Sequence, residues 1–75
     1  MQNPTPHPVA RNVRAEMSRR RITQAVVARH LNLSQPAVSQ RLIGSAEFKV
    51  SELQAVAELL GVPTASLLLA VEVAA

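Results

Sequence analysis

The chain has 75 residues, a net charge of +3 at neutral pH and no cysteine. This length allows one domain, and a domain of this size buries about 60% of the surface of its unfolded chain. The lack of cysteine excludes disulfides, thiolate zinc sites and cysteine nucleophiles. The longest aliphatic stretch, 67–71, is far shorter than the roughly 20 residues of a membrane span, and the polar residues 1–8 lack the features of a secretion signal. We therefore expect a small cytoplasmic protein with no membrane contact.

Positive charge is concentrated in the first part of the chain. Residues 1–46 contain seven arginines and one glutamate, whereas residues 47–75 contain one lysine and four glutamates. Such an asymmetry directs the basic half toward a polyanion, and nucleic acid is the usual one. From charge alone, a solvated arginine-rich face that only keeps the protein soluble is an equally good interpretation.

The first predicted element follows a polar segment that contains three prolines. We expect this segment, residues 1–8, to be a flexible arm. Val9, Val13 and Met17 then recur every four residues and predict an amphipathic helix. The arginines at 19–21 suit its C-terminal end, where positive charge interacts favourably with the helix dipole.

Two further helices are predicted on either side of a sharp turn. Thr23 is the expected N-cap of the second helix, and Asn32 is the expected left-handed residue that ends it. Ser34 is the expected N-cap of a third helix that reaches Ile43 and is ended by Gly44, with a proline in its first turn. The predicted inward residues of the second helix are Val27, Ala28 and Leu31.

The last part of the chain predicts two more helices. Residues 49–60 form the fourth, which Gly61 ends, and Pro63 opens a short fifth helix through 64–71. The predicted inward residues of the fourth helix are Leu53, Val56, Ala57 and Leu60. We expect no sheet, although residues 67–75 could pair as a strand between subunits. The expected fold is all-α, a compact bundle of about five short helices in one domain, 9–70, followed by an apolar tail, 71–75.

The third predicted helix has a polar outward face. Val38 and Leu42 lie four residues apart and define its buried side, and Gln40 projects almost opposite them. A glutamine amide pairs a donor with an acceptor, as the adenine edge does in the major groove of DNA. The alternative to base reading is that these residues form an ordinary polar, solvent-exposed helix surface. The candidate base-reading residues are Gln35, Pro36, Ala37, Ser39, Gln40 and Arg41.

The segment 22–44, ITQAVVARHLNLSQPAVSQRLIG, resembles the helix-turn-helix of the lambda-repressor-like superfamily, of the Cro/C1 or XRE type found in phage and bacterial regulators. SELQAVAELLGVP, 51–63, resembles the helix that follows in that family, and the similarity spans about residues 9–69. The matching positions are Gln24, Ala28, Leu31, Leu33 and Val38. The resemblance implies a non-enzymatic regulator, similar to small phage Cro or repressor proteins, that binds duplex DNA sequence-specifically.

Four positions depart from the family pattern. Asn32 stands where glycine is usual, Arg41 where many members have an apolar residue, and Leu42 where many have a glutamate that pairs with an arginine of the first helix. Met17 occupies the place of that arginine, so we expect a Met17–Leu42 apolar contact instead of the ion pair. Two orientations of Arg41 are then open, toward the DNA or along the protein surface.

Contacts to the DNA backbone are expected around the ends of the helices. The resemblance implies such a contact for Gln24, and hydroxyl groups and helix N-termini at these joints face the strands that flank the groove. The candidate phosphate-binding residues are Thr23, Gln24, Ser34, Ser45, Arg20, Arg29 and Lys49.

The two histidines and scattered glutamates form no metal or catalytic set, so we expect no enzyme activity and no cofactor. Phe48, the single aromatic residue, is expected beneath the fourth helix.

The C-terminal segment is too apolar to bury completely in so small a core. Exposed apolar patches commonly mark association surfaces, so we expect a homodimer in preference to a monomer with a frayed tail. A two-fold dimer would place its recognition helices, residues 34–43, about 34 Å apart on an imperfectly palindromic operator. The competing hypothesis is a protein-binding adaptor or antitoxin that uses this segment. The predicted dimer-contact residues are Leu68, Leu69, Val71 and Val73.

Overall fold

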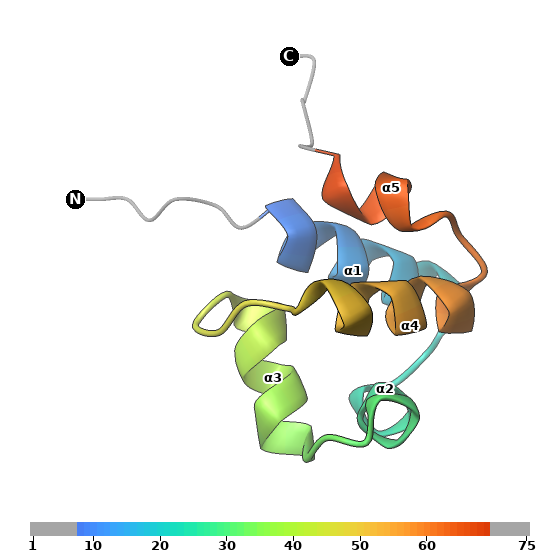
Figure 1. Ribbon diagram of the computed structural model, residues 1–75. Helices are drawn as coiled ribbons and strands as arrows, with labels where there is room; N and C mark the ends of the chain where they lie inside the picture. Colours follow the sequence, from blue (N-terminus) through green and yellow to red (C-terminus); the bar gives the residue numbers. More distant parts are fainter. Residues whose placement is uncertain (1–7, 70–75) are drawn as a thin grey trace.

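A computed structural model describes residues 8–69, which form five helices joined by short turns (Figure 1). The helices are α1 Pro8–Arg20, α2 Gln24–Leu31, α3 Gln35–Ile43, α4 Val50–Leu60 and α5 Thr64–Leu68. Residues 8–69 contain no strand, and no helix among them is both long and apolar enough to cross a bilayer. The predicted all-α fold of about five short helices is confirmed.

The five helices are arranged around a central pair. α1 and α4 lie next to each other, with α5 packed on one side of the pair and α2 on the other (Figure 1). α3 starts beside α2 and runs toward α1 and the beginning of α4. The α2–α3 unit and α5 therefore occupy opposite ends of the molecule.

Every helix contributes one completely buried side chain to a single core. These side chains are Val13, Val27, Val38, Val56 and Leu67, in helix order. Complete burial of a Val or Leu side chain stabilises a fold by roughly 1.5–3 kcal/mol relative to exposure. A domain this small has few such side chains, so the loss of any one of them affects all five helices.

The predicted inward faces of the second to fourth helices are largely confirmed. Val27 and Ala28 of α2 and all four predicted residues of α4 are buried in the core. Leu31 and Phe48 are half-buried and pack against the same core cluster. The helical periodicity of the apolar residues therefore predicted which side of each helix faces inward.

The observed boundaries differ from the predicted ones at three helix ends. α1 begins at Pro8, one residue earlier than expected, because a proline without an N–H is well suited to the first turn of a helix. α4 begins at Val50, with Lys49 as its N-cap. α5 ends at Leu68 and is shorter than predicted. Residues 1–7 of the proposed arm, the tail and the predicted dimer-contact residues Val71 and Val73 lie outside the described residues.

α1 and α5 are joined by one polar side chain that the sequence did not point out. The Asn12 side-chain amide donates to the carbonyl oxygen of Leu67 at 2.9 Å and to that of Leu69 at 2.6 Å. Carbonyls at the end of a helix have no partner within the helix. Asn12 therefore supplies hydrogen bonds that the end of α5 would otherwise lack.

Candidate nucleic-acid interface

The α2–turn–α3 unit is built by capping residues at each of its joints. The Thr23 hydroxyl accepts a hydrogen bond from the backbone N–H of Val26, and the Ser34 hydroxyl accepts one from that of Ala37, each at 3.2 Å. Asn32 ends α2 in the left-handed conformation, with φ 59° and ψ 42°. All three predictions are confirmed, and together they fix the turn that leads from α2 into α3.

The end of α3 is closed by a second left-handed residue. Gly44 has φ 88°, a value that costs glycine nothing and strains other residues. The Gln40 carbonyl accepts hydrogen bonds from the backbone N–H groups of Ser45 and Ala46 at 3.0 and 3.2 Å. The backbone of Gln40 is therefore held in place, while its side chain is exposed.

The rotation of α3 about its axis agrees with the prediction from periodicity. Val38 and Leu42 are buried in the core, and Gln40 is exposed on the other side of the helix. Gln35 and Pro36 are exposed at its N-terminal end. Two smaller base-reading candidates, Ala37 and Ser39, are half-buried at the edges of this face.

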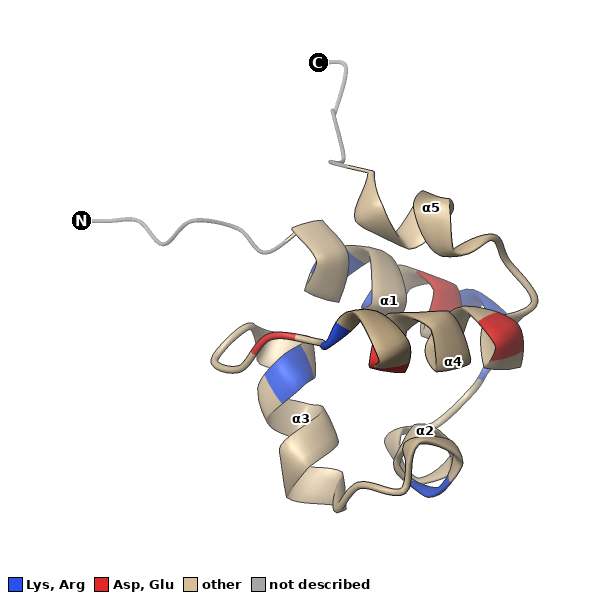
Figure 2. Ribbon diagram, in the orientation of Figure 1, with Lys and Arg blue, Asp and Glu red and all other residues tan. Residues whose placement is uncertain are grey.

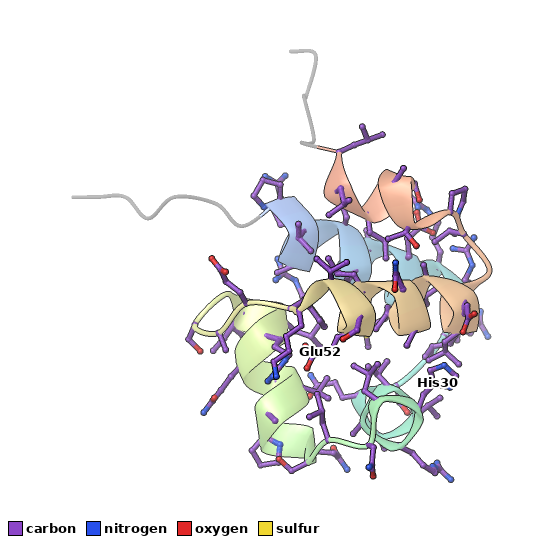
Figure 3. All side chains as sticks on the ribbon, viewed as in Figure 1. His30 and Glu52 are labelled. Atoms are coloured by element: carbon purple, nitrogen blue, oxygen red, sulfur yellow. The ribbon has the colours of Figure 1, made fainter. Side chains whose placement is uncertain are left out.

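Arg41 differs from the other candidates on α3, because its side chain lies along the protein toward α4. Its Nε and Nη2 atoms donate to the two carboxylate oxygens of Glu52 at 2.8 and 3.3 Å. Its Nη1 atom donates to the Ala37 carbonyl at 3.0 Å. All three nitrogens of the guanidinium are engaged, so of the two orientations of Arg41 that the sequence left open, this structure has the one along the protein surface. Figure 3 shows the labelled Glu52 at this junction of α3 and α4.

The first helix also holds α3. The Arg14 guanidinium donates a hydrogen bond to the carbonyl oxygen of Leu42. Met17 and Leu42, the residues that stand at the positions of the family ion pair, both belong to the buried core cluster. An apolar core and a side-chain-to-backbone hydrogen bond therefore connect α1 to α3 in this chain.

Ile43 is a candidate that the sequence analysis missed. It is 67% exposed at the end of α3. At 100° per residue it lies about 60° from Gln40 around the helix axis, on the outward side. The sequence predicts it only as the last residue of the third helix, although its position on the helical wheel follows from the same periodicity. An exposed aliphatic side chain here is suited to contact a thymine methyl group.

All seven phosphate-binding candidates are exposed, but they differ in what else they bind. The Thr23 and Ser34 hydroxyls accept hydrogen bonds within the protein and keep their own protons for donation. The Ser45 hydroxyl donates to the Gln40 carbonyl at 3.2 Å, which uses its only proton. Gln24 is the first residue of α2.

The charged candidates differ in the same way. Arg20 forms an ion pair with Glu16, and Arg19 forms a second one with the same carboxylate at 2.6 Å. Burial tends to raise the pKa of Glu16, but the hydrogen bonds from Arg19 and Arg20 outweigh it and hold this pKa below its ordinary value. Arg29 and Lys49 have no ion pair among residues 8–69. These two side chains are therefore more available than Arg20 to bind a phosphate.

The charge distribution leaves the helix-turn-helix free of acidic groups. Between Glu16 and Glu47 the chain contains no Asp or Glu and five arginines. Figure 2 shows no red segment on α2 or α3, whereas red segments occur on α1, on α4 and in the loop after α3. The acidic second half of the chain thus lies beside α3, and one of its glutamates binds Arg41 directly.

Glu52 is held in its charged form by this environment. Burial tends to raise its pKa, but the hydrogen bonds from Arg41 and from the backbone N–H of Lys49 together with the positive charge of Arg41 outweigh it and hold this pKa below the ordinary value. The Lys49 N–H lies 2.9 Å from Oε1 of Glu52. One carboxylate therefore binds α3 and the start of α4 together.

Residues 8–69 offer no support for a metal site. This part of the chain has no group of three or more side chains suited to hold a metal ion. His30 is exposed on α2 (Figure 3). The outward face of α3 with its capped N-terminus is thus the best-defined candidate surface.

Comparison with known families agrees with this geometry. A family model described as a helix-turn-helix domain matches residues 9–69, which include all five helices except Pro8. The chain belongs to the helix-turn-helix domain family. No curated protein and no solved structure matches the chain.

The family assignment gives the arrangement of α2 and α3 a functional meaning. In DNA-binding helix-turn-helix domains the second helix of the motif enters the major groove, and the first lies across the backbone. In this domain the two helices joined by the tight turn at Asn32 are α2 and α3. The family indicates a DNA-binding regulator of a typically non-enzymatic class, with DNA as the partner.

Proposed function

We propose that this helix-turn-helix protein is a sequence-specific transcriptional regulator of the Cro/C1 (XRE) type, similar to small phage Cro or repressor proteins. It occupies a DNA operator through α3 and excludes polymerase or a competing regulator. It acts in the cytoplasm of a bacterial or phage-infected cell and needs no cofactor. The proposal is carried by one observation, the exposed amide of Gln40 on a helix whose opposite side is locked into the core.

The outward face of α3 is suited to the major groove. An α-helix with its side chains is about 10–12 Å across, and the groove is about 12 Å wide. Gln40 and Gln35 read base edges, Ile43 contacts a thymine methyl, and the small side chains of Ala37 and Ser39 allow a close approach. Pro36 removes one backbone N–H from the first turn, where it would lack an internal partner.

Backbone contacts position this helix on the duplex. The N-termini of α2 and α3 present Gln24, Thr23 and Ser34, whose N–H and hydroxyl groups bind phosphates. Arg29 and Lys49, which form no ion pair with other described residues, provide positive charge next to the same strands. Arg20 and Ser45, which already have partners in the protein, contribute through the local field and through the backbone.

The regulator binds as a homodimer to an imperfectly palindromic operator. Leu68 and Leu69 are 54% and 65% exposed at the end of α5 and support an apolar dimer contact. We propose that Val71 and Val73, beyond the described residues, extend this contact. A two-fold dimer spaces its recognition helices by one turn of DNA, about 34 Å.

Duplex binding at several salt concentrations tests the proposal. The logarithm of the association constant should fall with the logarithm of salt concentration, at a slope of about −0.9 for each phosphate contacted. Selection of bound sequences from a random oligonucleotide pool should then return a motif with two related half-sites. The proposal fails if duplex binding is absent, or if the selected pool has no enriched motif.

The alternative function is a protein-binding module, an adaptor or antitoxin. It is favoured by an apolar pocket of about 400 Å³ formed by the start of α1, the α3–α4 loop and the end of α5. Phe48, Val50 and Leu68 are among its lining residues. A protein that binds no duplex but captures a partner through this pocket would fit the alternative.

A further inference from the structure

α3 is joined to α4 by an ion pair whose hydrogen bonds have a defined direction. The guanidinium of Arg41 meets both oxygens of the Glu52 carboxylate, at 2.8 and 3.3 Å. Two parallel hydrogen bonds of this kind fix the orientation of an arginine as well as its distance. The side chains are 15% and 12% exposed, respectively, so water competes less for this pair than for a surface pair. No other ion pair among residues 8–69 joins two helices.

Glu52 is itself firmly held. Its Oε1 atom also accepts the backbone N–H of Lys49 at 2.9 Å, which places the carboxylate in the first turn of α4. The next residue, Leu53, is buried in the core, as is Val56 one turn later. α4 is thus an anchored element, and its carboxylate is a fixed point against which α3 is positioned.

Rotation of α3 would displace its outward side chains by a large fraction of a hydrogen-bond length. For a helix radius with side chains of about 5–6 Å, a rotation of about 20° moves an outward group by about 2 Å. Hydrogen bonds to base edges are lost over such a distance. Val38 and Leu42 keep the apolar side inward, but apolar contacts are non-directional and set the rotation less sharply.

We propose that the Arg41–Glu52 pair sets the rotation of α3 and thereby determines which base Gln40 reads. Gln40 and Arg41 are consecutive in the chain, so a rotation that takes Arg41 away from Glu52 moves Gln40 by the same angle. Arg41 and Glu52 are positioning residues, and Arg41 makes no contact with DNA. The inference rests on the proposed function, because it assigns the two residues a part in sequence recognition.

The first test compares Glu52→Gln with the matched variant Glu58→Gln. Both changes remove one negative charge from α4, but Glu58 is exposed and forms no ion pair among the described residues. Affinity is measured for the selected operator, for operators changed at single base pairs and for random duplex, at a temperature at which circular dichroism shows each variant to be folded. Glu52→Gln should lose about ten-fold in discrimination at the base pair that Gln40 reads, the size of one good base contact. Glu58→Gln should keep it.

The second test separates positioning from direct DNA contact by Arg41. Arg41→Met, Glu52→Gln and the double variant should lose discrimination to the same extent, because each removes one shared contact. If Arg41 instead binds a phosphate, Arg41→Met lowers the salt slope by about 0.9 and weakens all sequences, which overturns the inference. If Arg41→Met does not fold, Arg41→Lys takes its place in this comparison, because lysine keeps the positive charge but cannot form the two parallel hydrogen bonds to Glu52.

A measurement without DNA keeps the inference separate from the proposed function. Residual dipolar couplings report the orientation of α3 relative to α4 in the free protein. Glu52→Gln should change this orientation and Glu58→Gln should not, whether or not the wild type binds duplex. An unchanged orientation overturns the inference, and the absence of sequence-specific binding by the wild type overturns the proposed function.

Discussion

Replacement of Gln40 by alanine should remove sequence preference at one base pair and leave the fold intact. The side chain is exposed and makes no hydrogen bond to other described residues, and surface changes of this kind shift stability by less than about 0.5 kcal/mol. A good two-pronged contact to a base is worth about 1–3 kcal/mol, which corresponds to about 5- to 150-fold in relative affinity. The variant should therefore bind the operator and its single-base variants at that position almost equally.

Competition binding with labelled operator and unlabelled single-base variants measures this loss directly. Gln54→Ala is the matched control, because Gln54 is exposed on α4, away from the outward face of α3. Affinity for random duplex should stay the same in both variants. An equal loss of affinity for operator and random duplex, or unchanged discrimination, would refute the role of Gln40 as a base reader.

Four further predictions concern the fold and its charges. Leu67→Ala should destabilise the protein by about 2–5 kcal/mol, because Leu67 is completely buried where α5 meets the core; thermal unfolding checks this. Gly61→Ala should cost about 1–2 kcal/mol from its φ of 74° alone, since no atom lies within 4 Å of the added Cβ, and urea unfolding should show it. The pKa of Glu52 is below its ordinary value of 4.5, so its contribution to stability is complete above pH 4.5 and is lost as the pH falls through the lowered value; the urea midpoint of Glu52→Gln should change less between pH 7 and pH 3 than that of the wild type. Arg29→Ala should weaken binding to every duplex and lower the salt slope by about 0.9, and an effect confined to one sequence would contradict a phosphate contact.

The features that the sequence predicted well are those decided by near neighbours in the chain. Thr23, Asn32 and Ser34 act on backbone groups within a few residues, and capping preferences describe such local geometry directly. Which side of α3 faces inward followed from the spacing of Val38 and Leu42, because helical periodicity is also local. This is why the face that carries Gln40 was identified without coordinates.

The features that the sequence did not predict depend on partners far along the chain. Arg41 could be assigned to the DNA or to the protein surface until Glu52, eleven residues away, was seen beside it. The hydrogen bonds of Asn12 reach across 55 and 57 residues. Neither contact follows from periodicity or capping, since both require knowing which helices are neighbours in space.

The link between Asn12 and the end of α5 has a practical consequence for studies of this protein. It brings the two ends of the described chain together on the side remote from α2 and from the start of α3 (Figure 1). Chain ends that lie close together at a surface tolerate additions well. A label attached at Pro8 or Leu69 would therefore lie on the side of the molecule opposite α2 and the start of α3.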